Sequence, residues 1–122
     1  MTEAIDLKTK LSVFEDAWHP RIIGEANGQY LKLAKAEGHL EWHTHEEEDE
    51  VFLCLEGCLV LEMRDSEVTL EPGQLFVMPR GVEHRPRAEP TASILLLEPK
   101  QTQHLGKHGG PRAIDVEEQE WI

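Results

Sequence analysis

Four residues, His43, His45, Glu50 and His84, are of the types and spacing that could bind one metal ion. Successive side chains of a β-strand point to opposite faces, so His43 and His45 would share a face. Glu50 opens an apolar run, and His84 follows a Pro-Arg-Gly turn sequence that marks the start of another strand. Three imidazoles and one carboxylate form a mixed nitrogen and oxygen donor set. Such a set suits Zn, Fe, Ni, Co or Cu better than Ca or Mg.

The segment between His45 and Glu50 is strongly acidic, which raises the alternative that the histidines lie on a solvated surface. Residues 46–49 are all Glu or Asp, and a run of this kind is usually an exposed loop. Glu50 differs because it adjoins an apolar strand, where an inward carboxylate would be costly unless it paired with a cation. We therefore expect residues 46–49 to form a loop and Glu50 to be a ligand.

The remaining sequence predicts short strands joined by turns. Apolar residues at helical spacing over residues 6–14 predict a short N-terminal helix or arm. The expected strands cover residues 22–25, 30–36, 39–45, 51–55, 59–64, 67–70, 75–78, 83–87 and 92–98. Asn27-Gly28 and Glu56-Gly57 are expected to form two-residue hairpin turns. This succession predicts an all-β protein with a closed antiparallel barrel of the jelly-roll type.

The two segments that hold the candidate ligands resemble the two motifs of the cupin family. The first motif combines a glycine, His-x-His, a glutamate and a second glycine, here Gly38, His43, His45, Glu50 and Gly57. The second combines a glycine, Pro-x-Gly and a histidine, here Gly73, Pro79, Gly81 and His84. Two departures are visible, since Gly38 is one residue closer to His43 than in the family pattern and Ala88 replaces a closing asparagine. Neither departure involves a ligand.

The resemblance implies the cupin double-stranded β-helix, a jelly-roll barrel with short N- and C-terminal arms. We expect one domain over residues 1–122, with the barrel at about residues 20–99 and a C-terminal arm over residues 100–122. The expected cofactor is one divalent transition metal, with Fe, Zn, Ni, Mn, Co and Cu left open. One fold hosts many activities, so the motifs predict the site better than the reaction.

The composition of the chain limits the kinds of partner that it can bind and indicates where in the cell it is found. The chain of 122 residues has 24 acidic and 12 basic residues and a formal charge of −12, which argues against binding nucleic acid or anionic membranes. Its N-terminus does not have the pattern of a signal peptide, and no apolar run approaches membrane-spanning length, so we expect a cytoplasmic protein that binds a small molecule. Cys54 and Cys58 are expected to lie on opposite faces as free thiols.

The strand after Glu50 is apolar on both faces, which bears on assembly. With Glu50 inward, Phe52 also points inward, whereas Val51, Leu53 and Leu55 point out and must be covered. The terminal arms or a second subunit could cover them. Small cupins commonly pair through such a sheet, so the resemblance implies a homodimer, and a monomer capped by its own termini is the alternative.

Several further side chains could serve the site. The expected substrate pocket, with His39 at its rim and Arg80 as a nearby cation, contains His39, Phe52, Gln74, Phe76, Met78 and Arg80. Glu41 is the nearest candidate for a general base. The other histidines, His19, His104 and His108, lie in turn-like or Gly-rich segments and are not expected to coordinate the ion.

Three functions follow from this set of residues. The first is a small metalloenzyme acting on an oxygenated molecule as an oxygenase, isomerase or lyase. The second is a cupin that binds or senses a small molecule without catalysis. The third is a structural homodimer whose metal secures the barrel, and it is disfavoured because buried charged ligands stabilise a core poorly.

Overall fold

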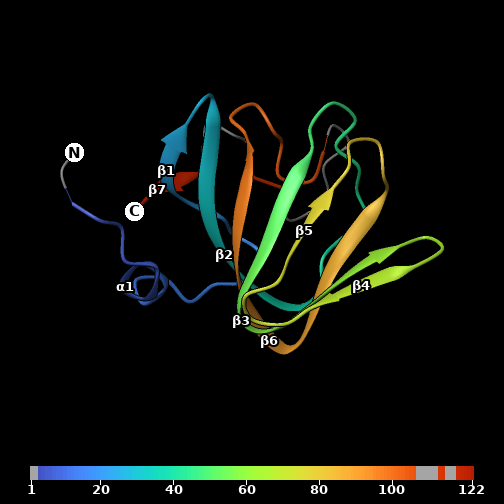
Figure 1. Ribbon diagram of the computed structural model, residues 1–122, viewed down its shortest axis with the longest axis horizontal. Coiled ribbons are helices and arrows are strands. Elements are labelled where there is room, and N and C mark those ends of the chain that lie inside the picture. Colours follow the sequence, from blue (N-terminus) through green and yellow to red (C-terminus); the bar gives the residue numbers. More distant parts are fainter. Residues whose placement is uncertain (1–2, 107–112, 115–117) are drawn as a thin grey trace.

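A computed structural model describes residues 3–106, 113–114 and 118–122, and it shows an all-β barrel with one short helix (Figure 1). Its elements are α1 (Leu7–Leu11), β1 (Arg21–Ala26), β2 (Gln29–His39), β3 (Glu50–Met63), β4 (Glu67–Leu70), β5 (Leu75–Met78), β6 (His84–Pro99) and β7 (Glu120–Trp121). The expected all-β class, the N-terminal helix and the Asn27-Gly28 turn between β1 and β2 are confirmed. No helix in the described part of the chain is long and apolar enough to cross a membrane.

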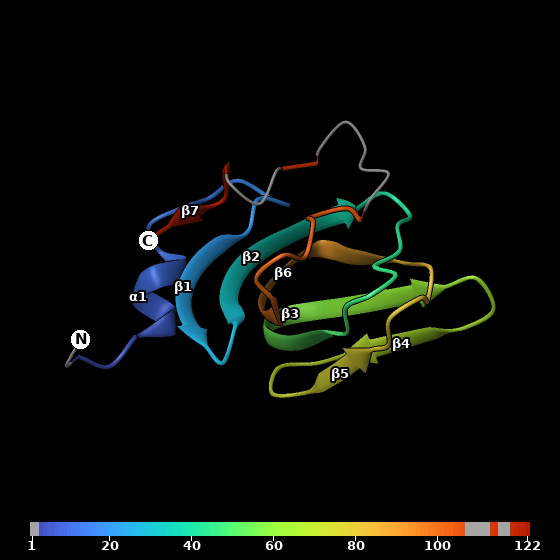
Figure 2. The same cartoon turned by 90° about the horizontal axis from the view of Figure 1, so that it is seen from above.

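Two long strands, β3 and β6, organise the barrel. The strand order is β4-β3-β6-β2-β1-β7, and β5 pairs with the first part of β3 while β4 pairs with its last part. The strands curve around the interior of the barrel, as the view from above shows (Figure 2). Buried apolar side chains fill this interior. β3 and β6 are antiparallel, with Met63 opposite His84 and Val51 opposite Leu97, so their first residues stand at opposite ends of the ladder. The ladder bends at its register shifts and brings these two residues to one end of the barrel, with side-chain atoms 3.6 Å apart. Those first residues are Glu50 and His84.

The expected hairpin at Glu56-Gly57 is wrong, because β3 continues through both residues. The register against β6 shifts between Cys54 and Glu56 and again between Gly57 and Leu59, so this region is a pair of bulges within one strand. Gly57 has φ +78°, and a Cβ at this position would overlap the backbone carbonyl of Thr91. The glycine therefore permits close approach of two strands rather than a chain reversal. In β6, the two segments expected at 83–87 and 92–98 are likewise one strand.

The expected strand over residues 39–45 is also wrong. The register of β2 shifts at Gly38, which has φ +67°, and the strand ends at His39. Residues 40–49 then form an irregular connection whose one β-bridge joins His43 to His84. Residues 40–49 make few backbone hydrogen bonds to β6. Their side chains therefore do not alternate between two faces as they would in a regular strand. His43 and His45 come together through this bridge and the following bend, not through a shared strand face.

The alternation expected for β3 is confirmed. Glu50, Phe52 and Cys54 are buried, while Val51 and Leu53 are half-buried on the outer side. The interior cluster includes Leu59, Leu61, Ile94 and Leu96 besides Phe52 and Cys54. Cys54 and Cys58 are both free thiols, as expected.

The terminal segments cover one part of the outer side of the barrel. Leu11 of α1 and Phe14 pack with Ile23 and Leu33, and Leu55 joins this second apolar cluster. The cover does not extend over the part of the sheet formed by β5 and the start of β3. There Leu75 is 58% exposed and Val77 is 48% exposed. We refer to this part as the outer β3–β5 face; its apolar residues are Val51, Leu53, Leu75, Val77 and Leu97.

Candidate metal centre

The structure brings together the four residues that the sequence singled out as ligands. His43, His45, Glu50 and His84 each offer one ligand atom, and these atoms all lie within 4.8 Å of one another. Their exposed fractions are 8%, 3%, 5% and 1%, so the cluster is buried inside one end of the barrel. Glu50 and His84 are the first residues of β3 and β6, and the connection from β2 to β3 supplies the other two.

Backbone carbonyls fix two of the three imidazole rings. The Nδ1 atom of His43 lies 2.8 Å from the carbonyl oxygen of Glu41, and that of His84 lies 2.9 Å from the carbonyl oxygen of Val82. A carbonyl can only accept a hydrogen bond, so Nδ1 carries the proton in both rings. The lone pair of Nε2 is then free in each, which is the arrangement that metal-binding histidines require.

Several buried polar atoms at this centre have no hydrogen-bond partner among the described residues. They are both ring nitrogens of His45, Oε1 of Glu50 and Nε2 of His84. Oε1 of Glu50 lies 3.4 Å from Nε2 of His45 and 3.6 Å from Nε2 of His84. Unpaired buried polar atoms are costly, and a cation between them would satisfy all of them at once. The residues therefore fit a bound transition metal.

The protonation of the centre also favours a cation. Burial and the neighbouring imidazole of His84 lower the pKa of His43 to about 4, so the ring of His43 is neutral near neutral pH. Burial opposes the charged form of His45, but the carboxylate of Glu50, helped by that of Glu48, raises its pKa above the ordinary value. Burial likewise opposes the charge of Glu50, yet His45 and His84 hold its pKa well below the ordinary value. A positive charge, carried by a proton on His45 or by a metal, balances this carboxylate.

The sequence interpretation missed a buried ion pair behind Glu50. Nζ of Lys32 lies 2.7 Å from Oε2 of Glu98, and these two side chains are 1% and 4% exposed. Glu98 also neighbours Glu50 on the adjacent strand. Burial and the neighbouring carboxylate of Glu50 raise the pKa of Glu98 well above its ordinary value. Of the two carboxyl groups, Glu50 therefore holds its negative charge more firmly than Glu98, which depends on Lys32 for its charged form.

The alternation of side chains along the strands could have predicted the pair of Lys32 and Glu98. Glu98 stands two residues after the inward Leu96, and Lys32 lies opposite Leu96 in the register of β2 and β6. Val51 pairs with Leu97, so the next residues, Glu50 and Glu98, are neighbours on adjacent strands. Two charged residues at inward positions of different strands predict a pair, since neither would be buried alone.

Three of the six expected pocket residues face the barrel interior. Phe52 lines a cavity of about 30 Å³ together with His43 and Glu50. Met78 is buried opposite Glu50 in the register of β3 and β5, and Phe76 packs against the core opposite Phe52. Of these three, only Phe52 borders the cavity.

The other three expected pocket residues lie away from the cavity and are engaged elsewhere. Gln74 is exposed at the start of β5, where its side-chain oxygen accepts a hydrogen bond from the backbone of Glu71. Arg80 is exposed and paired with Asp49, and His39 is 46% exposed beside Glu62. The chain changes direction at Gly38 and at the turn before β5. Residues close to the motifs in sequence therefore need not lie in the pocket.

The cavity beside His43 and Glu50 is enclosed mainly by residues that the sequence did not indicate. They include Trp18, Leu40, Pro86, Ile94, Leu96 and His104. Trp18 arrives from the N-terminal arm and donates a hydrogen bond from Nε1 to the carbonyl oxygen of Glu37 at 2.8 Å. His19 instead contacts Asp16 at 3.0 Å, and His108 lies outside the described residues.

Glu41, the candidate base, acts at the centre through its backbone. Its carbonyl oxygen accepts the hydrogen bond from His43, and its side chain is half-buried. The expectation that its carboxylate shares a face with His43 depended on a regular strand that does not form. The backbone contact makes Glu41 a residue that orients a ligand.

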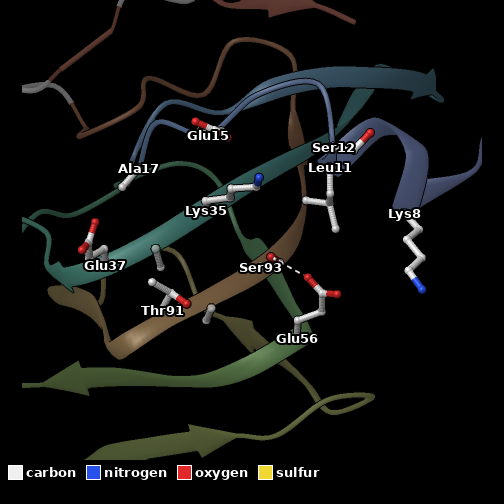
Figure 3. Close-up of a pocket in the computed structure, with 12 residues that line it drawn as sticks. Lys8, Leu11, Ser12, Glu15, Ala17, Lys35, Glu37, Glu56, Thr91 and Ser93 are labelled. Atoms are coloured by element: carbon white, nitrogen blue, oxygen red, sulfur yellow. Dashed lines mark hydrogen bonds between the residues drawn. The ribbon is translucent and has the colours of Figure 1, made fainter.

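A larger cavity of about 360 Å³ lies on the outer side of the sheet, between the N-terminal segment and strands β2, β3 and β6 (Figure 3). Its rim is charged, with carboxylates from Glu15, Glu37 and Glu56. The hydroxyl of Ser93 donates a hydrogen bond to Glu56 at 3.1 Å across it. Nζ of Lys35 donates to the carbonyl oxygen of Phe14 at 2.5 Å. None of the four candidate ligands lines this cavity.

An all-β barrel with a buried cluster of three histidines and one glutamate defines a class, the small barrels built around one internal metal site. The family model described as the Cupin domain matches residues 29–98, and the chain belongs to this family. The match covers β2 to β6 and all four candidate ligands, so the fold expected from the two motifs is confirmed.

Known proteins similar to this chain support the same family. The chain is 43% identical to a cupin-2 domain containing protein from Shewanella frigidimarina, whose structure matches with a TM-score of 0.77 over 79% of this chain and 94% of that one. Protein NMB1881 from Neisseria meningitidis is 36% identical, with a TM-score of 0.73 over 80% and 99% of the two chains. The uncharacterized protein YdbB from Bacillus subtilis is 34% identical over 66% of this chain and 73% of its own length.

Proposed function

We propose that this protein is a metal-dependent cupin enzyme that acts on a small oxygenated molecule, as an oxygenase, an isomerase or a lyase. The observation that carries the proposal is the convergence of four buried ligand atoms within 4.8 Å. An ion held by three histidines and one glutamate keeps one or two positions open for water or a substrate oxygen. The ion would supply Lewis-acid or redox chemistry at that position.

The chain's own residues prepare this site in three ways. The carbonyl oxygens of Glu41 and Val82 hold the rings of His43 and His84 with Nε2 toward the centre. The ion pair of Lys32 and Glu98 lies beside Glu50 and sets the charge around it. Outer partners of this kind orient the ligands and tune their basicity, and their loss commonly weakens metal affinity.

The size of the interior cavity limits what can react. About 30 Å³ beside His43 and Glu50 is room for roughly one or two water molecules. Its walls are largely apolar, with Phe52, Ile94 and Leu96 among them. The geometry favours a small substrate, or one end of a larger substrate, presenting an oxygen to the metal.

The metal content of the purified protein tests the proposal. Elemental analysis of protein prepared without added metal should show stoichiometric transition metal in the wild type and its loss in His43→Ala and His84→Ala. His19→Ala is the matched control, because His19 contacts Asp16 and not the centre. Metal-free wild-type protein, or variants that keep the metal, would overturn the site. Oxygen uptake and product analysis with diols, thiols and keto acids then identify the reaction class.

A second candidate is a cupin that binds or senses a small molecule without catalysis. The described residues that line the cavity are mostly apolar, and beside the ligands His43 and Glu50 they offer one group that could act as an acid or base, His104. Binding of a small oxygenated ligand to the metal-loaded protein without turnover, measured by calorimetry and product analysis on the same samples, would favour this function.

We also propose that the protein is a homodimer in which a second copy covers the outer β3–β5 face. The exposure of Leu75 and Val77, beside half-buried Val51, Leu53 and Leu97, supports it, because apolar patches of this kind are typical of association surfaces. Analytical ultracentrifugation should show a dimer for the wild type and a monomer for Leu75→Glu and Val77→Glu. Val13→Glu is the control, since Val13 is 61% exposed but lies outside this face. A monomeric wild type would contradict the proposal.

A further inference from the structure

A cleft adjoins the metal centre on the outer side of His45. It encloses about 180 Å³ and is lined by His45, Glu46, Glu47, Glu48, Gln101, Gln103 and Gly106. We refer to it as the acidic cleft. Of the four candidate ligands, only His45 lines it, whereas His43 and Glu50 line the apolar interior cavity. His45 therefore borders the acidic cleft and also belongs to the centre.

His45 differs from the other two histidines of the centre. His43 and His84 use Nδ1 to bind backbone carbonyls, but neither ring nitrogen of His45 has a hydrogen-bond partner among the described residues. The side chain is only 3% exposed, and its Nε2 lies 3.4 Å from Oε1 of Glu50. A buried ring that borders the cleft with an unsatisfied nitrogen is costly without a ligand. It points to an ion that occupies or passes this position.

The acidic run divides into two parts with different partners. The carboxylate of Asp49 accepts hydrogen bonds from the backbone nitrogen of Arg80 at 2.9 Å and from its Nε at 3.3 Å, which anchors the loop. Glu46 and Glu47 are exposed and Glu48 is half-buried, and all three line the acidic cleft. Three carboxylates and the amide side chains of Gln101 and Gln103 supply the oxygen atoms that hydrated divalent cations prefer.

The opposite wall of the acidic cleft is fixed against the ligand segment. Gly106 has φ +72°, and a Cβ at this position would overlap the backbone carbonyl of Thr44. Only a glycine allows the segment that carries Gln101 and Gln103 to approach the residue between His43 and His45 so closely. The width of the acidic cleft is therefore set by backbone contact.

We propose that the acidic cleft is the route by which the metal reaches the centre, where a hydrated divalent cation is first held by the carboxylates of Glu46, Glu47 and Glu48 and then passes to His45. This inference rests on the proposed metal binding. A cleft lined by one sign of charge concentrates counter-ions and speeds their arrival. The interior cavity beside His43 and Glu50 is small and largely apolar, so an ion that entered through it would lose its bound water without gaining other ligands.

The rate of metal uptake tests the route. The cleft variant carries Glu46→Gln, Glu47→Gln and Glu48→Gln, and the control variant carries Glu15→Gln, Glu37→Gln and Glu56→Gln at the larger outer cavity. Each variant removes three negative charges, so the two have the same net charge. Metal-free protein is mixed with Co²⁺ in a stopped-flow instrument, and tryptophan fluorescence is followed because Trp18 shares a cavity with His43 and Glu50.

At low ionic strength we expect uptake by the cleft variant to be roughly 10-fold slower than by the wild type, and uptake by the control to change less than about two-fold. Salt should reduce the difference, because it screens the cleft. Elemental analysis after long incubation should show full occupancy in all three proteins, which separates the route from the centre itself.

The outcomes distinguish the two proposals. Equal uptake rates for the cleft and control variants would overturn the route and leave the metal centre standing. No Co²⁺ uptake by the wild type would overturn the proposed metal function and the route together. Should the triple variant melt at lower temperature than the control, Glu47→Gln and Glu48→Gln are tested singly. Unchanged uptake in both single variants would also overturn the route.

Discussion

Two regions of this barrel gather charged residues, and they resolve their charges in opposite ways. One is the buried centre of His43, His45, Glu50 and His84 with Lys32 and Glu98 behind it. The other is a surface network, here named the arginine network, formed by Trp42, Glu62, Arg64, Glu67, Glu83, Arg85 and Arg87. In the network, Arg85 lies 3.1 Å from Glu62 and Arg87 lies 2.6 Å from it. In the centre, polar atoms of three of the ligands lack any hydrogen-bond partner among the described residues.

This difference in charge pairing indicates which of the two clusters binds a ligand. Each arginine of the network has a carboxylate partner, and Trp42 lies under the guanidinium groups of Arg64 at 3.9 Å and Arg85 at 4.9 Å. Charges that satisfy one another in this way leave little to attract a substrate. The buried centre is deficient by one cation, so its stability and its function both depend on what binds there.

The largest effect should come from breaking the ion pair behind the centre. Lys32→Met leaves the carboxyl of Glu98 buried without its cation, and removal of one partner of a buried pair typically costs about 3–5 kcal/mol. Urea unfolding of the metal-free protein measures the loss. The double variant Lys32→Met/Glu98→Leu removes both charges and should recover most of the stability. A loss in Lys32→Met no larger than in the double variant would show that the pair is not coupled.

Metal binding should stabilise the wild type by a similar amount. At a free metal concentration of about 1,000 times Kd, binding to the native state alone adds about 4 kcal/mol to the free energy of unfolding. His84→Ala should show almost none of this gain, because it loses a ligand at the buried centre. Thermal melting with and without Co²⁺ provides the measurement. An equal metal-dependent shift in both proteins would place the ion elsewhere.

The affinity for metal should rise with pH near neutrality. A proton on His45 must leave before its Nε2 can bind the ion, and Glu50 and Glu48 raise the pKa of this ring. Below that pKa, affinity should increase by up to about 10-fold per pH unit, and above it the increase should stop. His43 adds no dependence in this range because its pKa is about 4. Calorimetry in buffers of different ionisation enthalpy measures the released proton, and Glu48→Gln should lower the pH at which the increase stops. An affinity that is flat with pH would contradict this account.

The sequence predicted the barrel and the ligand cluster because both depend on local chemistry. Glu50 and His84 stand at strand starts that turn sequences and apolar runs mark clearly, and the alternation of Glu50, Val51 and Phe52 follows from strand geometry. The prediction that His43 and His45 lie together was confirmed, but its reason was wrong. The two residues do not share the face of a strand, because a β-bridge from His43 to His84 replaces the expected strand.

What the sequence did not predict depends on contacts between distant segments. The partners of Arg80 and His39 are Asp49 and Glu62, 31 and 23 positions away along the chain, and nothing local identifies them. Gly57 has the spacing of a turn residue, but the approach of Thr91 decides its role. The cavity beside the centre is closed by Trp18 and His104 from the two ends of the chain, which only the folded barrel brings together.

The smallest effect should come from the arginine network. Arg85→Ala removes a half-buried guanidinium from Glu62, but Arg87 remains 2.6 Å from the same carboxylate, so no charge is left without a partner. Ion pairs near the surface whose partners keep a second counter-charge contribute about 1 kcal/mol or less. Urea unfolding should therefore show a loss several times smaller than for Lys32→Met, and the Co²⁺ affinity of Arg85→Ala should equal that of the wild type. A fall in metal affinity would connect the network to the centre through Trp42 and the neighbouring His43, and the two regions could then no longer be treated as independent.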